Sequence, residues 1–229
     1  STGLSMWSVF QRPEEVSRGL TRFPIMLESG DRFSSAGRRV LAVSPDGRYV
    51  VYQANQQLYL RSMDQMEATP IRGTTESGGG RSATFSPDNQ WIAFQHQGLI
   101  KKVAVTGGAP LALGEAGNPY GMSWANGDMI FFGQGPSGLW RVPAAGGTSE
   151  LIVAVEEGEQ AQSPQLLPGG EWLLFTLRTS SASAWDESQI VVQSLETDER
   201  RVLINGGTDG RFVPTGHIVY SQGNTLLAV

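Results

Sequence analysis

The feature that most constrains this sequence is a short turn motif that returns along the chain. Ser44-Pro45-Asp46-Gly47 is followed by a second copy, Ser86-Pro87-Asp88-Asn89, and the two prolines are 42 positions apart. Degenerate copies occupy residues 125–128, 167–170 and 213–216, so the motif keeps a period of roughly forty residues. A repeat of this length indicates one supersecondary unit per repeat, stacked on its neighbours to bury a continuous core.

Each motif copy lies among short runs of apolar residues that favour β-strands. Four such runs per repeat, stacked radially, predict an all-β chain: a β-propeller of four-stranded antiparallel blades, with about five blades. The runs directly after the motifs are apolar on both faces, which is typical of strands covered on both sides. The expected first strands are 40–43, 83–85, 122–124, 165–166 and 211–213, and the second strands are 49–52, 91–94, 129–132, 172–175 and 217–220. The third strands are 58–60, 99–105, 139–142, 190–192 and 225–229, and the fourth are 68–71, 110–113, 150–153 and 201–204.

The residues of the motif are those that β-turns favour. Proline presets φ for a β-turn, aspartate bonds its own backbone, and glycine accepts the left-handed conformation. Asn89 replaces the turn glycine of the first copy, and the third and fourth copies lack Ser-Pro. We therefore assign a structural role in turns to these residues: Pro45, Asp46, Gly47, Pro87, Asp88, Pro168 and Gly169.

The repeats divide the chain into an N-terminal arm, 1–21, and a propeller domain, 22–229. Residues 13–16 can open one short helix, because proline is tolerated in a first turn. The fifth repeat lacks a fourth run, and the apolar run 22–27 can supply that strand and close the ring. The alternative is an open arc of a larger ring, completed by further blades or by another chain through self-association.

The composition of the chain limits the kinds of partner and site that it can have. The net charge is −5 with a pI near 5.1, which argues against a nucleic-acid partner. The chain has no Cys, so disulfides and cysteine-based metal sites are excluded. No apolar run approaches the length of a membrane span. Trp91 and Trp172 occupy matching repeat positions, which predicts that both pack between blades.

The Ser-Pro-Asp-Gly copies, each followed by an aromatic-rich strand, resemble the WD40-like repeats of TolB-type β-propellers over residues 22–229. A closer similarity is to the propeller domains of bacterial receptor-like serine/threonine kinases. The segments 21–25, 57–61, 98–103, 138–143 and 216–220 carry it. No glycine-rich loop or His-Arg-Asp motif of a kinase is present. The resemblance implies a non-catalytic binding or scaffold module in an extracytoplasmic location, periplasmic or at the cell surface.

Motifs for catalysis are scarce. There is no Gly-x-Ser-x-Gly elbow, and the two histidines, His96 and His217, lie at strand ends where a backbone or solvent contact suffices. Gly78-Gly79-Gly80 lacks the Lys-Ser/Thr of a phosphate loop. A glycan-acting hydrolase is the enzyme alternative, but it needs paired carboxylates, and the first strands are poor in Asp and Glu. We expect no catalytic residues, metal site or cofactor; a structural fragment of a larger receptor kinase is the third alternative.

In the propellers that this chain resembles, the second-to-third loops and the inter-repeat loops share one face, opposite the turns, so the resemblance implies a binding face there. Loops carry function because a rigid scaffold fixes them while their sequence varies. Trp185, a large ring in a polar insertion, either makes a contact there or folds back over a blade. The candidate residues for a protein, peptide or glycan are Arg81, Tyr120, Glu159, Trp185, Asp186 and Asp209.

Overall fold

The computed structural model describes residues 24–25, 32–33, 40–75, 81–182 and 184–229. The expected N-terminal arm, 1–21, and the short helix at 13–16 lie outside these residues. Within the described part of the chain, the one helix is the 3₁₀ turn η1, Trp185–Glu187. No helix in that part is long and apolar enough to cross a membrane.

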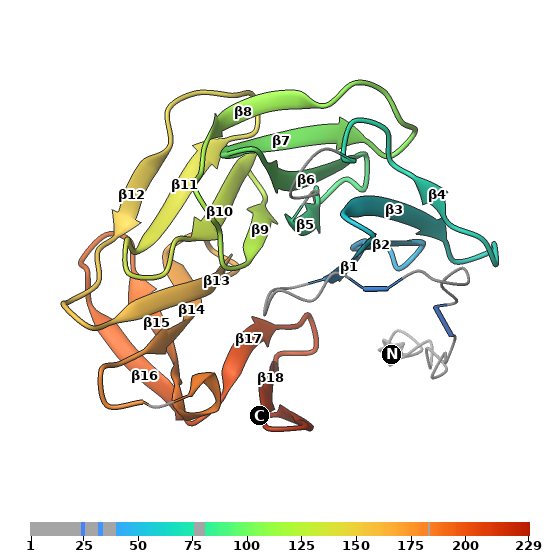
Figure 1. Cartoon of the computed structure of the whole chain (residues 1–229). Helices are drawn as coiled ribbons and strands as arrows, with labels where there is room; N and C mark the ends of the chain where they lie inside the picture. Colours follow the sequence, from blue (N-terminus) through green and yellow to red (C-terminus); the bar gives the residue numbers. More distant parts are fainter. Residues whose placement is uncertain (1–23, 26–31, 34–39, 76–80, 183) are drawn as a thin grey trace, which may run out of the picture.

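Five antiparallel sheets follow one another around a common centre (Figure 1), which confirms the expected all-β propeller of about five blades. Four sheets have four strands, with the first strand of each repeat innermost and the fourth outermost. The first two blades are β1 Leu41–Val43, β2 Tyr49–Ala54, β3 Gln57–Ser62, β4 Thr69–Pro70, then β5 Arg81–Phe85, β6 Trp91–His96, β7 Leu99–Ala104, β8 Leu111–Glu115. The others are β9 Met122–Ala125, β10 Met129–Gly133, β11 Leu139–Pro143, β12 Glu150–Val153; β13 Gln160–Leu166, β14 Trp172–Arg178, β15 Gln189–Ser194, β16 Arg200–Asn205; and β17 Thr208–Phe212, β18 Ile218–Gln222, β19 Thr225–Ala228.

The core consists of apolar layers between neighbouring blades. The second strands are buried on both faces, as in β14 of the fourth blade, whose five central residues are all buried. Phe94, Phe132 and Phe175 are fully buried at equivalent places in three blades. Trp91 packs against the layer between the second and third blades, and Trp172 against the layer between the fourth and fifth. The predicted inter-blade role of these two tryptophans is confirmed.

The inner strands share a backbone irregularity. Ser82, Gly121, Ser163 and Asp209 each lie five residues before the second residue of the next turn, and each has a positive φ between 52° and 81°. The pairing register shifts at this point in β5, β13 and β17. The bulge brings neighbouring blades into contact, since the Ser163 N–H donates to the Tyr120 carbonyl at 2.8 Å. These bulges therefore tie the blades together at the ends opposite the turns.

Among the described residues no strand closes the ring between the fifth and first blades (Figure 1), and the fifth sheet has three strands, β17, β18 and β19. Of the run 22–27, expected to close it, the structure describes Pro24 and Ile25, and both contact the first blade. The Pro24 carbonyl accepts from Arg61 at 2.6 Å, and Ile25 packs on the buried cluster of Val50 and its neighbours. These two residues thus cover the exposed side of the first blade and do not pair with β19.

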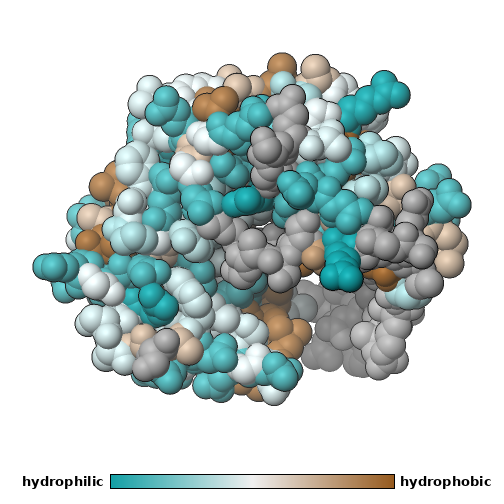
Figure 2. Space-filling model, in the orientation of Figure 1, coloured by the Kyte–Doolittle hydropathy of each residue, from teal (hydrophilic) through white to brown (hydrophobic). Residues whose placement is uncertain are grey.

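Phe33 continues this contact with the first blade, because it forms an antiparallel bridge to Ala54 and an edge-on ring contact with Tyr52. On the other side of the opening, Figure 2 shows hydrophobic side chains gathered over the fifth blade. Leu226 and Val229 of that blade are 74% and 66% exposed. Within the described residues, Ile25 and Phe33 thus contact the apolar side of the first blade, whereas Leu226 and Val229 on the fifth blade are exposed.

Candidate functional site

The first-to-second strand turns gather at one end of the blades, which we call the turn face: residues 44–47, 86–89, 125–128, 167–170 and 213–216. In the first turn the Ser44 hydroxyl donates to Asp46 at 2.6 Å and accepts from the N–H of Tyr49 at 2.9 Å. The Arg48 N–H donates to the same Asp46 oxygen at 3.0 Å. The Ser44 hydroxyl and then this N–H hold the pKa of Asp46 below its usual range. Asp46 therefore carries its charge on the turn face at neutral pH.

The second turn repeats this arrangement. The Ser86 hydroxyl donates to Asp88, the Gln90 N–H donates to Asp88 at 3.0 Å, and the pKa of Asp88 is lowered for the same two reasons. Asn89 adopts a φ of 62°, which asparagine tolerates better than most residues. Its side-chain oxygen accepts from the N–H of Asp46 at 3.1 Å, so the two turns are linked across the blade boundary. The departure from glycine at this position adds a contact between blades.

A hollow of about 960 Å³ opens at the centre of the turn face, where the inner strands of all five blades end. None of the residues that line it carries a charge. Phe85, Trp124 and Phe212 supply aromatic surface, and Val43, 53% exposed, contributes an aliphatic side chain from the first blade. The remaining lining residues are Pro45, Thr84, Pro87, Ser123, Ala125, Asn126, Gly127, Gln165, Leu166, Leu167, Pro168, Gly169, Gly170 and Pro214.

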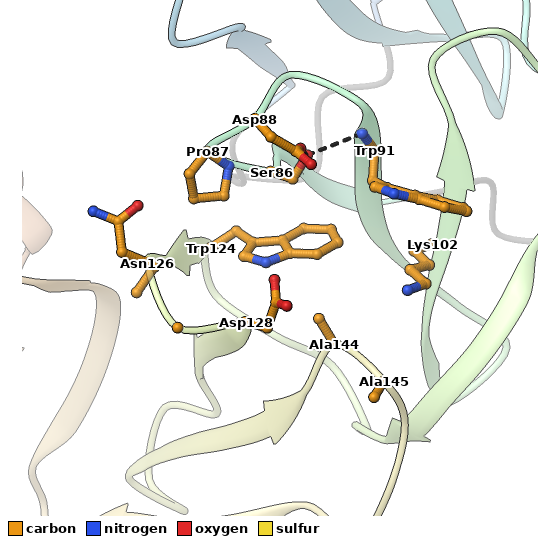
Figure 3. Close-up of a pocket in the computed structure, with 12 residues that line it drawn as sticks. Ser86, Pro87, Asp88, Trp91, Lys102, Trp124, Asn126, Asp128, Ala144 and Ala145 are labelled. Carbon is orange, nitrogen blue, oxygen red and sulfur yellow. Dashed lines mark hydrogen bonds between the residues drawn. The ribbon is translucent and has the colours of Figure 1, made fainter.

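A side pocket of about 350 Å³ adjoins the hollow between the second and third blades. Figure 3 shows the indole of Trp124 between the Ser86–Asp88 turn and Asp128. Lys102 forms another wall, with its ammonium 4.5 Å from the ring centre of Trp91. Trp124 is only 9% exposed, lines both cavities, and its indole nitrogen has no hydrogen-bond partner among the described residues.

The six residues predicted as a binding face lie at the strand ends opposite the turns, as the antiparallel order of the blades requires. Tyr120 precedes β9, and its ring lies against Gly135, 3.3 Å from where a Cβ would stand. Arg81 begins β5, and the next residue, Ser82, donates its hydroxyl to the Pro119 carbonyl at 3.2 Å. Arg81 and Tyr120 thus lie on adjacent blades.

The other four residues lie on the loop that joins the third blade to the fourth, and on the fourth and fifth blades. Glu159 forms a half-buried ion pair with Arg200 at 3.3 Å, so its charge is already balanced. Asp209 pairs with Arg211 at 3.0 Å. Trp185 and Asp186 form η1, which lies beside β17, and the Arg178 guanidinium sits 5.0 Å from the Trp185 ring centre. Their role in binding stays a prediction.

The hollow was not foreseen from the sequence, which gave the turn residues a purely structural role. Its signal was nevertheless present, since Pro45, Pro87, Pro168 and Pro214 recur at one repeat position and must meet at one end of a closed or open ring. Phe85, Trp124 and Phe212, the aromatic residues that line the hollow, directly precede the second, third and fifth turns. In the described part of the chain no three His, Asp or Glu side chains group as metal ligands.

No protein-family profile matches the sequence, and no curated protein matches it significantly. Solved structures match it through the fold. The TolB crystal structure from Acinetobacter baumannii has a TM-score of 0.61 at 18% identity, over 83% of this chain and 50% of that one. The structure of an oligogalacturonate lyase in complex with manganese has a TM-score of 0.60 at 13% identity, over 81% of this chain and 58% of that one.

The β-propeller domain of Cps50 (Swd1) from Myceliophteria thermophila gives a TM-score of 0.62 at 11% identity, over 85% of this chain and 65% of that one. The chain therefore spans between half and two thirds of the length of these structures. One protein named as an enzyme stands among them, so this architecture accommodates more than one function. At these identities the likeness shows the fold, and the chain shares the β-propeller architecture of TolB.

Proposed function

We propose that this chain is a non-catalytic binding propeller that takes a peptide, or an extended loop of a protein partner, into the hollow of its turn face. The uncharged, aromatic-lined hollow at the centre of that face carries the proposal. At about 960 Å³ it is at the upper end of the usual range for ligand pockets, about 300–1,000 Å³. Buried aromatic anchors in such a depression dominate the energy of peptide and protein contacts.

The inner wall of the hollow is preorganised. The Gln165 side chain donates to the carbonyl of Phe212 at 3.1 Å and accepts from its N–H at 2.8 Å, which fixes the fourth blade against the fifth. A wall held by such contacts loses little conformational freedom when a ligand binds, and this favours affinity. The extracytoplasmic location implied by the sequence resemblance is a part of this proposal.

A peptide-display selection tests the function. Random heptapeptides are selected on the protein, on Val43→Glu and on Val202→Glu. Val43 lines the hollow, whereas Val202 lies on the outer strand β16 with a similar exposure of 47%. A charge placed in the apolar hollow should abolish enrichment, because its desolvation opposes binding. We expect common sequences to be enriched on the unmodified protein and on Val202→Glu only.

Equal enrichment on Val43→Glu would overturn the proposal, and so would no enrichment on any of the three proteins. Folding of both variants is checked by far-UV circular dichroism and by thermal unfolding. Val43 is already half exposed, so its substitution should leave the fold intact.

A further inference from the structure

The carboxylates on the turn face form a rim around the uncharged hollow. Asp46, Asp88, Asp128 and Glu171 each directly follow a residue that lines it. Arg48 is the base nearest to Asp46, at 3.8 Å, and it is 80% exposed. The hydrogen bonds within the turns keep Asp46 and Asp88 ionised. The rim is therefore predominantly negative at neutral pH, while the centre is apolar.

The side pocket brings this rim into contact with an aromatic surface. Figure 3 shows Asp88 and Asp128 on opposite sides of the Trp124 indole. Pro87, Asn126 and Gly127 line both the side pocket and the hollow, so the two cavities adjoin each other. A group entering the side pocket thus meets two carboxylates, Asp88 and Asp128, beside the Trp124 ring.

A basic side chain fits these surroundings. Guanidinium and ammonium groups are attracted by the face of an indole and by carboxylates, and the flat guanidinium suits both at once. The structure already shows this preference in the same pocket, because Lys102 places its ammonium over Trp91. Elsewhere on the blades Arg201 lies over Trp172 and Arg178 over Trp185. An acidic group would instead face Asp88 and Asp128, and these two carboxylates outnumber Lys102, the one cationic residue that lines the pocket.

We propose that the partner is a short peptide segment with an apolar centre and a flanking basic residue: the apolar part fills the hollow, and the basic side chain enters the pocket between Trp124, Asp88 and Asp128. This inference rests on the proposed function, since it assigns the chemistry of the segment that the hollow takes.

The selection described above supplies the first test, because the enriched heptapeptides can be scored by composition. We expect an excess of Arg and Lys over the input library, next to aliphatic or aromatic residues. Enrichment of apolar sequences without that excess would overturn this inference and leave the proposed function standing. Absence of any enrichment would overturn the proposed function itself.

The second test uses the most enriched peptide, made synthetically with a fluorophore, and measures its Kd by anisotropy. The double variant Asp88→Asn/Asp128→Asn keeps the shape of both turns, since asparagine retains the accepting oxygen and tolerates the positive φ of 58° at residue 128. We expect its affinity to fall about fivefold, with a weaker dependence on salt. The matched control, Glu156→Gln/Glu157→Gln, removes the same charge from exposed residues of the inter-blade loop at the opposite end of the blades.

An equal loss of affinity in the control would show that only the net charge matters, and it would overturn the assignment of the pocket. An unchanged Kd in Asp88→Asn/Asp128→Asn would overturn it as well. A peptide in which each basic residue is replaced by glutamine provides an independent readout, because its Kd should be about the same for the unmodified protein and for the double variant. A further loss of affinity for this peptide in the double variant would indicate that the substitutions disturb the hollow.

Discussion

Asp46 and Asp88 combine two tasks on the turn face. Each closes its turn through a serine hydroxyl and a backbone N–H two residues on, and each presents a charge beside the central hollow. The same hydrogen bonds produce both effects, because they favour the ionised carboxylate over the protonated one. Substitution by alanine would therefore disturb turn and charge together, whereas asparagine separates them.

The lowered pKa values of these two carboxylates predict how the stability of the protein changes at low pH. Their pKa values in the folded protein are lowered, so their contribution to stability is complete above the unfolded value of about 3.9 and disappears as the pH falls through the folded values. We expect the urea midpoint of unfolding to decrease below about pH 4. In Asp46→Asn/Asp88→Asn that decrease should be smaller. An identical decrease in the double variant would show that other groups control acid unfolding.

At the scale of the strand, the third and fourth blades meet through backbone rather than through side chains. Gly133 ends β10, and a Cβ built on it would lie 2.7 Å from the Cα of Gln162 and 2.9 Å from the carbonyl oxygen of Ala161. Tyr120 contributes to the same junction, because its carbonyl accepts from the Ser163 N–H of the fourth blade at 2.8 Å. The position thus requires glycine because of proximity, not because of its φ.

Gly133→Ala should consequently separate β10 from β13. The expected loss of unfolding free energy is about 1–3 kcal/mol, as for other overpacked sites, measured by urea denaturation. Gly117→Ala is the matched control, because a Cβ there meets only the Gln134 side-chain oxygen at 3.4 Å. We expect its stability to lie within about 0.5 kcal/mol of the parent protein. Comparable losses in the two variants would contradict the close approach of these strands.

At the scale of the molecule, stability is distributed unevenly around the open ring. β6, β10 and β14 belong to the second, third and fourth blades, which have a neighbouring blade on each side, and they are almost entirely buried. β18 and β19 of the fifth blade are half-buried or exposed. In arrays of repeats each unit is stabilised mainly by its neighbours. The fifth blade has such a neighbour on one side within the described chain, namely the fourth blade, which contacts it through Leu174, Ile190 and Val192.

Hydrogen exchange should therefore proceed from the fifth blade inward. We expect the amides of β18 and β19 to exchange through local opening, at free energies well below that of global unfolding, and those of β10 and β14 to exchange last. Mass spectrometry of peptic fragments measures this order directly. Equal protection of β18 and β14 would contradict it and would indicate that the fifth blade is covered in solution.

The sequence by itself determined the repeat, the strand order and the turns. This was possible because a strand and its turn are encoded locally: continuous apolar runs mark β6 and β14, and Ser-Pro-Asp marks the turn that precedes β6. The predicted strands coincide with the observed ones except for a few residues at their ends. The inner strand β13 is the main difference, since it begins at Gln160, well before the apolar pair at 165–166 that predicted it.

Only the tertiary structure decided which residues meet across blades. The hollow combines residues from five repeats, such as Val43 and Phe212, whose separation in sequence exceeds any local pattern. The bulges at Ser82, Ser163 and Asp209 could not be predicted either, because serine and aspartate tolerate many conformations and the left-handed one is imposed by the neighbouring blade. The covering of the first blade by Pro24 and Ile25 depends likewise on burial of an apolar surface, a property of the assembled ring and not of the segment itself.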